Sequence, residues 1–393
     1  MPSVEATKRD ARNRPTRDTK WRGRFRDLNG RTRSKTFDRK FDAERFVART
    51  TTDMARGDWV DPRSTRIRFD ALADTWWATT VKLAPTTRRG YWQLLENHVR
   101  PHFGTRVQGS IDWAEVERFV AEKLAEGHNP KRVRDMVSVV SSIMKGAVRA
   151  GLRRDNPAAD HSIPVRRAKV GRGAVLTMTE VHQLVDHTRD PYKPAVWMLA
   201  LLGLRPAELC GLRVGAVDFA RSTVHITETL NVVHRYGDAK RTLVEGPTKS
   251  TAGDRVLPMP AWLRDDLAAM LTQRDESEWA QSTPLFRAVK GRGRLEVPML
   301  RDHVIRPALR AAGLPESFRT YDLRHTHASL LIEQGANPLE VAQRMGHTDA
   351  SITLRVYGHV FEGAQARLTA KLDELRASTA APTAEIVALR REA

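Results

Sequence analysis

The chain has 393 residues, of which 40% are hydrophobic, and its 66 Lys and Arg against 47 Asp and Glu give a formal net charge of +19. This balance is typical of two or three folded domains that bind a polyanion, and it favours nucleic acid over a ribosomal or membrane-surface role. The single cysteine, Cys210, excludes an intramolecular disulfide and a metal site of clustered cysteines. Without an apolar run of membrane-spanning length or an apolar signal core, we expect a cytoplasmic, nucleoid-associated protein with no membrane contact.

Residues 1–62 are expected to form a small N-terminal DNA-binding domain, with residues 1–20 disordered. Alternating segments on both sides of Asn29-Gly30 predict two strands joined by a tight turn, and apolar residues at helical spacing follow. The strands carry arginines that would form a basic ribbon suited to the DNA major groove, namely Arg22, Arg24, Arg31 and Arg33. The alternative is a structural hairpin with a solvated basic face.

Residues 67–160 are expected to form a helical domain, followed by a basic linker over 161–173. Thr86 and Asn129 are predicted N-caps, the latter with Pro130 at the first helical position. Four basic side chains on these helices are candidate phosphate contacts: Arg88, Arg89, Lys131 and Arg132. The alternative is that they belong to an ordinary solvated helix face.

Residues 174–376 alternate between helical and strand patterns and predict a mixed domain, followed by a tail over 377–393. Arg205 directly precedes Pro206, which suits the first position of a helix, so Arg205 would face a bound anion at a helix start. Lys249 lies in a predicted hairpin turn.

Two later stretches of this domain carry further polar side chains that suit catalysis. Tyr321 and Arg324 are three residues apart, which predicts one helical turn and a shared face. Gly346 is a predicted helix C-cap, His347 follows in the turn, and Tyr357 lies on the next helix.

Each of these residues is ordinary alone, but their order and spacing together resemble the catalytic boxes of the tyrosine recombinases, the family of phage integrases and chromosome-dimer resolvases. The matching stretches are Leu-Gly-Leu-Arg-Pro-x-Glu-Leu around Arg205, the lysine Lys249 with Arg255 six residues on, Asp-Leu-Arg-His-Thr around Arg324, Met-Gly-His ending at His347, and Thr-x-x-x-Tyr-x-His starting at Thr353.

The resemblance covers about residues 67–376 and is strongest from Leu199 to His359. Residues 21–60 are more loosely similar to the arm-binding domain of integrases, a three-stranded sheet with one helix. The implied fold class is therefore α+β and mainly helical: a small N-terminal three-stranded sheet domain, a helical core-binding domain and a mixed α/β catalytic domain.

The resemblance also implies how the boxes act on DNA. Tyr357 would attack a backbone phosphorus and form a 3′-phosphotyrosine that stores the bond energy, so no ATP is needed. Arg205 and Arg324 would clamp the non-bridging oxygens and, with His347, replace the metal ion of other nucleases. Lys249 would protonate the leaving 5′-oxygen. We expect no cofactor and no metal.

The chain departs from the family at one position of the second arginine box. Where the family often has His, this chain has Tyr321, whose phenol donates a hydrogen bond but, with an ordinary pKa near ~10, is no near-neutral base. Its role is therefore open. His325 is expected to point to another face of the helix as a supporting or core residue, His327 likewise, and His359 to neighbour Tyr357.

The expected function is site-specific recombination, in which an integrase cleaves and rejoins DNA to integrate or excise a mobile element. The expected partners are double-stranded DNA at core crossover and arm sites, three further copies in a tetramer, and a directionality factor or DNA-bending host protein. A type IB topoisomerase, with the same residue set, and a non-cutting regulator are the rivals. The basic N-terminal hairpin and the helical unit favour recombination, and the intact boxes argue against a regulator.

Overall fold

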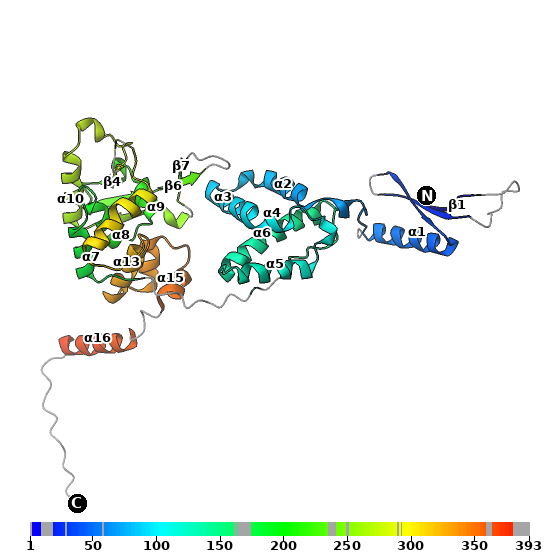
Figure 1. Ribbon diagram of the computed structural model, residues 1–393. Helices are drawn as coiled ribbons and strands as arrows, with labels where there is room; N and C mark the ends of the chain where they lie inside the picture. The colour runs from blue at the N-terminus through cyan, green and yellow to red at the C-terminus, as the bar shows by residue number, and fades with distance from the viewer. Residues whose placement is uncertain are drawn as a thin grey trace, which may run out of the picture. The chain divides into compact units, whose positions relative to one another are not determined.

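The computed structural model describes residues 2–8, 19–27, 30–56, 59–160, 163, 174–234, 241–248, 251–288, 291, 293–358 and 364–379. The chain divides into two compact units, Met1–Arg166 and Arg167–Ala393 (Figure 1). All of the expected linker over 161–173 except Ile163 lies outside the described residues, and so does the expected tail from residue 380 onward.

The first unit begins with three antiparallel strands and one helix: β1 (Ser3–Ala6), β2 (Trp21–Arg26), β3 (Thr32–Phe37) and α1 (Lys40–Ala55). β2 is the central strand of the sheet. Because Gly23 and Phe25 alternate with arginines along β2, one face of this strand is apolar and packs on Ala43 and Val47 of α1. A Cβ on Gly23 would lie 2.9 Å from Val47 Cγ2, so this close approach of sheet and helix requires glycine.

The expectation that all of residues 1–20 are disordered is wrong at Ser3–Ala6. This segment pairs with β2 in antiparallel register, with Ser3 opposite Arg24 and Ala6 opposite Trp21. Pairing with an open strand edge satisfies the backbone hydrogen-bonding groups of the segment, which its polar composition did not indicate.

The rest of the first unit is helical. Its helices are α2 (Phe69–Thr79), α3 (Pro85–Leu94), α4 (Arg100–Phe103), α5 (Trp113–Ala125) and α6 (Pro130–Arg149), with a π turn at Leu95–Val99 and 3₁₀ turns at Ser64–Arg66, Thr80–Lys82 and Gln108–Ser110. They enclose one apolar core that includes the fully buried Phe69, Phe103, Phe119, Met136 and Ile143.

The two predicted N-caps of this unit have opposite outcomes. Asn129 caps α6 as predicted, because its side-chain oxygen accepts the backbone N–H of Lys131 at 2.8 Å. Thr86 is not a cap, since α3 begins one residue earlier with Pro85 at its first position and Ala84 before it. The fixed φ of proline is preorganised for the first helical position, which places the helix start ahead of the threonine.

The second unit mixes helices with two small sheets. Its helices are α7 (Met178–Asp186), α8 (Lys193–Leu202), α9 (Pro206–Gly211), α10 (Ala261–Thr272), α11 (Val297–Met299), α12 (Arg306–Ala311), α13 (Asp322–Glu333), α14 (Pro338–Met345), α15 (Ala350–Tyr357) and α16 (Ala364–Thr379), with a π turn at Leu300–Ile305 and 3₁₀ turns at Val214–Ala216, Thr251–Gly253 and Glu276–Glu278. One antiparallel sheet has the order β4 (Val217–Asp218), β5 (Thr223–Ile226), β8 (Arg255–Pro258), and the other pairs β6 (Glu228–His234) with β7 (Arg241–Pro247).

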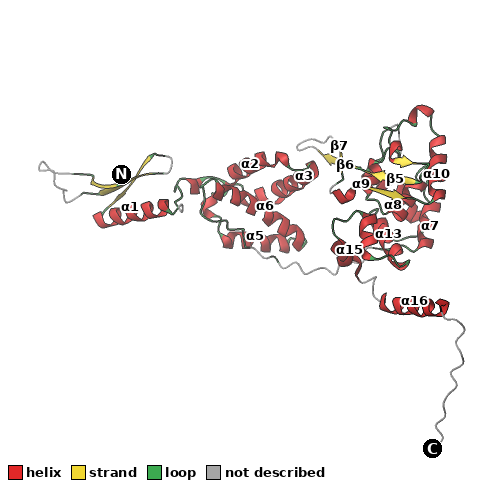
Figure 2. Ribbon diagram, turned by 180° about the vertical axis from the view of Figure 1, so that it is seen from behind, coloured by secondary structure: helices red, strands yellow, loops and turns green. Residues whose placement is uncertain are grey.

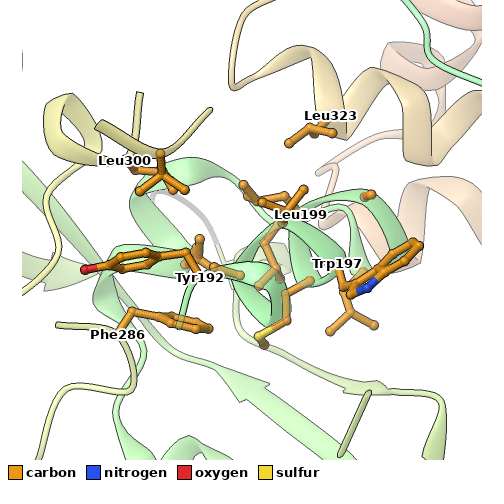
Figure 3. Packing of buried hydrophobic residues seen from close by; sticks show 14 of the residues in the cluster. Tyr192, Trp197, Leu199, Phe286, Leu300 and Leu323 are labelled. Carbon is orange, nitrogen blue, oxygen red and sulfur yellow. The ribbon is translucent and has the colours of Figure 1, made fainter. Parts of the chain in front are cut away.

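α8 is the central helix of the second unit. Its sequence is apolar on nearly all sides, and such a helix is stable only when it is surrounded. It contacts α7, α9, α10 and α13. Figure 3 shows Leu199 and Trp197 of α8 within the core to which Phe286, Leu300 and Leu323 contribute from much later in the chain. Packing on all sides therefore holds α8 in place, and the helix ends at Gly203, which has a positive φ of 64°.

The predicted fold class is confirmed: the chain is mainly helical, with a three-stranded sheet at its N-terminus and a mixed second unit. Figure 2 shows the predominance of helices, drawn in red, and the few short strands, drawn in yellow.

Truncating a core side chain of α8 is expected to weaken the second unit. Leu199→Ala removes a fully buried side chain, so the free energy of unfolding should fall by about 2–5 kcal/mol in chemical denaturation followed by circular dichroism. The matched control is Leu372→Ala on α16, where the leucine is 65% exposed and the change should stay within about 0.5 kcal/mol. Equal shifts for the two variants would contradict this core.

Candidate active site

The guanidinium of Arg324 lies in the interior of the second unit, with only 1% of the residue exposed. Its two terminal nitrogens donate to the carbonyl oxygens of Gly203 and Met345. These carbonyls stand at the C-terminal ends of α8 and α14, where the helix dipole is negative and favours a cation. Burial, assisted by the charge of Arg205, lowers the pKa of Arg324 to about 10, so it stays protonated at neutral pH.

Gly203 makes this contact possible. It has a positive φ of 64°, and a Cβ at this position would overlap the His327 ring. His327 is itself buried, and its Nδ1 contacts the carbonyl oxygen of Ala200 at 3.1 Å. Burial lowers the pKa of His327 to about 3, so its ring is neutral and acts as packing beneath Arg324.

Arg205 stands at the start of α9, with Pro206 at the first helical position as predicted. Glu208, fully buried one turn later, accepts the backbone N–H of Arg205 at 2.9 Å and also bonds its guanidinium. Arg205 donates further to the carbonyl oxygen of Gly346 at 3.2 Å, which joins the first arginine stretch to the histidine turn. Its side chain remains 31% exposed, so one side of the guanidinium is open to an anion.

Arg255 is the second partner of Glu208. It donates to Glu208 Oε2 at 3.0 Å and to the carbonyl oxygen of Arg344 at 2.9 Å. Burial alone would raise the pKa of Glu208, but the hydrogen bond and charge of Arg255, with the charge of Arg205, outweigh it and hold this pKa below its ordinary value. Glu208 is therefore ionised and balances two arginines.

His347 follows the C-cap of α14. Gly346 has a positive φ of 64°, as the predicted C-cap requires, and turns the chain so that His347 Nδ1 lies 2.9 Å from Thr353 Oγ1. Burial, followed by the charges of Arg324 and Arg205, lowers the pKa of His347 to about 4. At neutral pH the ring is uncharged, and with Nδ1 engaged by Thr353 its Nε2 is left for a bound anion.

Tyr357 is the last residue of α15 and is only 4% exposed. Its ring packs in a small apolar cluster with Ile332, Val341 and Met345. Burial raises the pKa of its hydroxyl above the ordinary value. The hydroxyl oxygen lies 2.8 Å from His325 Nδ1.

This contact corrects the expectation for His325. Its ring faces Tyr357 rather than another side of the helix, because α15 lies against the side of α13 that carries it, and sequence spacing did not show that packing. His359, the expected neighbour of Tyr357, lies outside the described residues.

Tyr321 stands directly before α13 with helical backbone angles, and its carbonyl oxygen accepts the Arg324 backbone N–H at 3.1 Å, so the two residues are one turn apart as predicted. Tyr321 is 43% exposed, whereas Arg324 is buried. Its ring meets the His325 ring edge-on at 5.5 Å between centroids. Tyr321 thus lies at the rim of the same cluster.

The remaining candidate, Lys249, lies outside the described residues. The sequence predicted no contacts for Glu208 or Arg255, and it predicted only a supporting or core role for His325. Glu208 carried one usable signal, a carboxylate three residues after a helix start, which suits a capping box. The contacts of Arg255 and His325 depend on packing between distant segments and left no local signal.

The candidate DNA-binding side chains of the first unit differ in their partners within the chain. Arg33 pairs with Asp27 and Asp61, and Arg24 with Glu5. Arg88 lies over the Trp77 ring and donates to Thr80, Lys131 pairs with Asp135, and Arg132 lies 3.3 Å from His98. Arg22, Arg31 and Arg89 are also among the described residues, Arg31 on the exposed surface. Because Arg33 pairs with two carboxylates of its own chain, part of its positive charge is already compensated before any DNA binds.

Among the residues that the structure describes, no group of three or more His, Cys, Asp or Glu side chains is arranged to hold a metal ion. In the same part of the chain no helix is both long and apolar enough to cross a membrane. The groups that converge are two guanidiniums, a neutral imidazole and a phenol hydroxyl. This set suits an anionic phosphate diester and a nucleophilic oxygen.

Comparison with known sequences matches both units. The sequence pattern of the phage integrase family matches residues 174–363, and that of the phage integrase central domain matches residues 69–163. The prophage phiRv2 integrase of Mycobacterium tuberculosis is 28% identical over 362 residues, which cover 91% of this chain and 93% of that protein. Tyrosine recombinase XerC of Alcanivorax borkumensis is 26% identical over 313 residues, with 76% and 93% covered.

Solved structures show the same fold. The Tn1549 transposon integrase in complex with transposon right end DNA matches with a TM-score of 0.64 at 17% identity and covers 77% of this chain and 99% of that one. A lambda integrase tetramer bound to a Holliday junction matches with a TM-score of 0.53 at 15% identity, with 84% and 94% covered.

The charge balance at Glu208 predicts that the Glu208→Gln variant is less stable than the wild type and that the difference depends on pH. The variant leaves Arg205 and Arg255 without their buried counter-charge, so the free energy of unfolding at neutral pH should fall by about 3–5 kcal/mol. Because the folded-state pKa of Glu208 is lowered, its contribution is complete above the unfolded value near 4.5 and is lost as the pH falls through the folded value. Urea denaturation across this range should therefore show wild type and variant converging in acid. A gap that is independent of pH would contradict the ionised state of Glu208.

Proposed function

Since this chain belongs to the phage integrase family, we propose that Tyr357 is the nucleophile with which it cuts and rejoins DNA. The chain is a tyrosine-type site-specific DNA recombinase, an integrase. One observation carries the assignment of the site: contacts bring together segments that are up to 152 positions apart, from Arg205 to Tyr357. Arg205 and Arg324 donate to the two carbonyls that directly precede His347. The Tyr357 hydroxyl contacts His325, the residue after Arg324.

The proposed reaction is a phosphoryl transfer to the tyrosine. The Tyr357 oxygen attacks the backbone phosphorus, the bond from phosphorus to the 5′-oxygen breaks, and the 3′-phosphate stays on the enzyme. A 5′-hydroxyl of the partner strand then attacks the phosphotyrosine and releases Tyr357. Because bond energy is kept in the phosphotyrosine, resealing needs no ATP.

The two arginines have complementary positions for this chemistry. Arg205 keeps an exposed side and would donate to a non-bridging oxygen. Arg324 is held by the two helix-end carbonyls and would donate through the N–H groups that these carbonyls do not use. His347, neutral and engaged at Nδ1, donates through Nε2 to the same phosphate. Lys249 is the proposed donor of the proton that the 5′-oxygen needs.

The proposed partner is double-stranded DNA. The helical residues 67–160 and the second unit would bind the core crossover site, and residues 1–62 would bind separate arm sites. Since recombination breaks four strands and each needs its own nucleophile, four protomers would act together. The lambda integrase tetramer on a Holliday junction supports this arrangement by likeness of fold. A directionality factor or a DNA-bending host protein would set the balance of integration and excision of a mobile element.

The rival activity is strand relaxation of the type IB topoisomerase kind, which uses the same residue set. The matched central domain and the integrase and XerC relatives favour recombination. A non-cutting regulator is the other rival, and it would form no covalent link to DNA.

The nucleophile is tested by phenylalanine substitution at two tyrosines. Tyr357→Phe keeps the buried ring but removes the attacking oxygen, so DNA binding should persist while the denaturant-resistant adduct on a nicked suicide substrate vanishes. Tyr321→Phe removes one hydrogen-bond donor at the rim, so adduct formation should slow by roughly 10- to 100-fold without loss of its end point. Tyr91→Phe in the helical unit is the control. An adduct formed by Tyr357→Phe and missing from Tyr321→Phe would reverse the assignment.

The arm proposal is tested by charge removal in the sheet domain. Arg22→Ala combined with Arg31→Ala removes two strand charges, so full integration should drop while cleavage of a core half-site stays near the wild-type rate. The matched control is Arg49→Ala on the exposed face of α1, which should leave both activities unchanged. Equal loss of integration and half-site cleavage would argue against a separate arm function.

A further inference from the structure

A phenol is a poor nucleophile until its proton leaves, so the hydroxyl of Tyr357 needs an acceptor within hydrogen-bond reach. His325 Nδ1 lies 2.8 Å from Tyr357 Oη, and the two rings lie 5.7 Å apart between centroids. In the tautomer that carries its proton on Nε2, His325 accepts the tyrosine hydrogen bond at Nδ1.

The other described groups around Tyr357 are unsuited to this task. Tyr321 offers a second phenol rather than an imidazole or carboxylate base. His347 turns Nδ1 toward Thr353, and His327 is buried with Nδ1 on a backbone carbonyl. Arg324 is a donor only and has no lone pair to offer.

We propose that His325 is the general base of DNA cleavage, which accepts the Tyr357 proton as the tyrosine oxygen attacks phosphorus. The inference rests on the proposed role of Tyr357 as nucleophile. As the bond from Tyr357 oxygen to phosphorus forms and the bond from phosphorus to the 5′-oxygen breaks, the phenol proton moves to Nδ1 and His325 becomes an imidazolium. The 5′-oxygen takes its proton from the separate acid. In rejoining, the imidazolium returns its proton to the departing Tyr357 oxygen.

The charges around His325 favour its neutral form. On its own helix and the preceding turn it faces Asp322, Arg324, Tyr321 and Arg319, and on the neighbouring segments it faces Tyr357 and the His347 ring. Burial lowers the pKa of His325 from 6.5, and the positive charges of Arg319 and Arg324 act in the same direction against the opposing charge of Asp322. At about pH 7 the ring is therefore an unprotonated acceptor, and cleavage should fail only as acid protonates it.

The test is the pH profile of single-turnover cleavage on a nicked suicide substrate, measured on the full chain. His325→Asn keeps a hydrogen-bond acceptor close to the position of Nδ1 but cannot take up a proton. We expect the plateau rate to fall about 100-fold or more, and the acid limb of the wild-type profile to disappear. A plateau within about twofold of wild type, or an unchanged acid limb, would overturn the proposal and leave His325 a positioning residue.

A second substrate separates proton removal from proton donation. When sulfur replaces the bridging 5′-oxygen, the leaving group departs without a proton, whereas Tyr357 must still lose its own. The His325→Asn defect should persist on this substrate, and its disappearance would place His325 on the leaving-group side and refute the base role.

Two controls keep the outcomes distinct. The first control is His187→Asn, which changes an exposed histidine whose ring contacts the carbonyl oxygen of Gln183 and which should cleave DNA like wild type. Thermal unfolding and DNA binding then check that the His325→Asn variant is folded. Tyr357→Phe is run in parallel. An adduct there would refute the nucleophile itself, whereas its absence combined with normal cleavage by His325→Asn would refute only the base.

Discussion

The buried guanidinium of Arg324 is the constraint on which the rest of the candidate site depends. A full positive charge in the interior is costly unless its surroundings compensate it, and here the C-terminal carbonyls of α8 and α14 do so. Because one guanidinium binds both carbonyls, the end of α8 is held close to the end of α14. The histidine turn and the tyrosine helix follow α14 directly, so their positions derive from the same contact.

A second constraint is the balance between the negative charge of Glu208 and the positive charges of the arginines beside it. The buried carboxylate of Glu208 bonds the guanidiniums of both Arg255 and Arg205 and compensates part of their positive charge. The site therefore does not hold three uncompensated guanidiniums. Arg205 is the partly exposed guanidinium of the group, and there a DNA phosphate would supply a further anion. His347 and His325 stay neutral in this positive field, which suits one to donate a hydrogen bond and the other to accept a proton.

Local chemistry made much of this molecule predictable from sequence. Backbone and capping preferences predicted two helix starts, at Pro206 and Asn129, and one helix end, at Gly346. The stretches around Arg205, Arg324 and Tyr357 were recognised by their residue spacing. What could not be predicted depends on tertiary packing. The contact of His325 with Tyr357 requires α15 to lie against one side of α13. The formation of strand β1 at Ser3–Ala6 requires an edge of β2 with which it can pair.

The central claim, that Tyr357 becomes covalently bound to DNA, is tested most directly by mapping the adduct. Wild-type protein trapped on a nicked suicide substrate is digested with trypsin and nuclease, and the peptide that carries the residual nucleotide is identified by mass spectrometry. Cleavage after Arg355 and Arg367 places Tyr357 in peptide 356–367, whereas cleavage after Arg319 and Arg324 places Tyr321 in peptide 320–324. The account predicts the nucleotide on peptide 356–367, and a nucleotide on peptide 320–324 or on no tyrosine would contradict it.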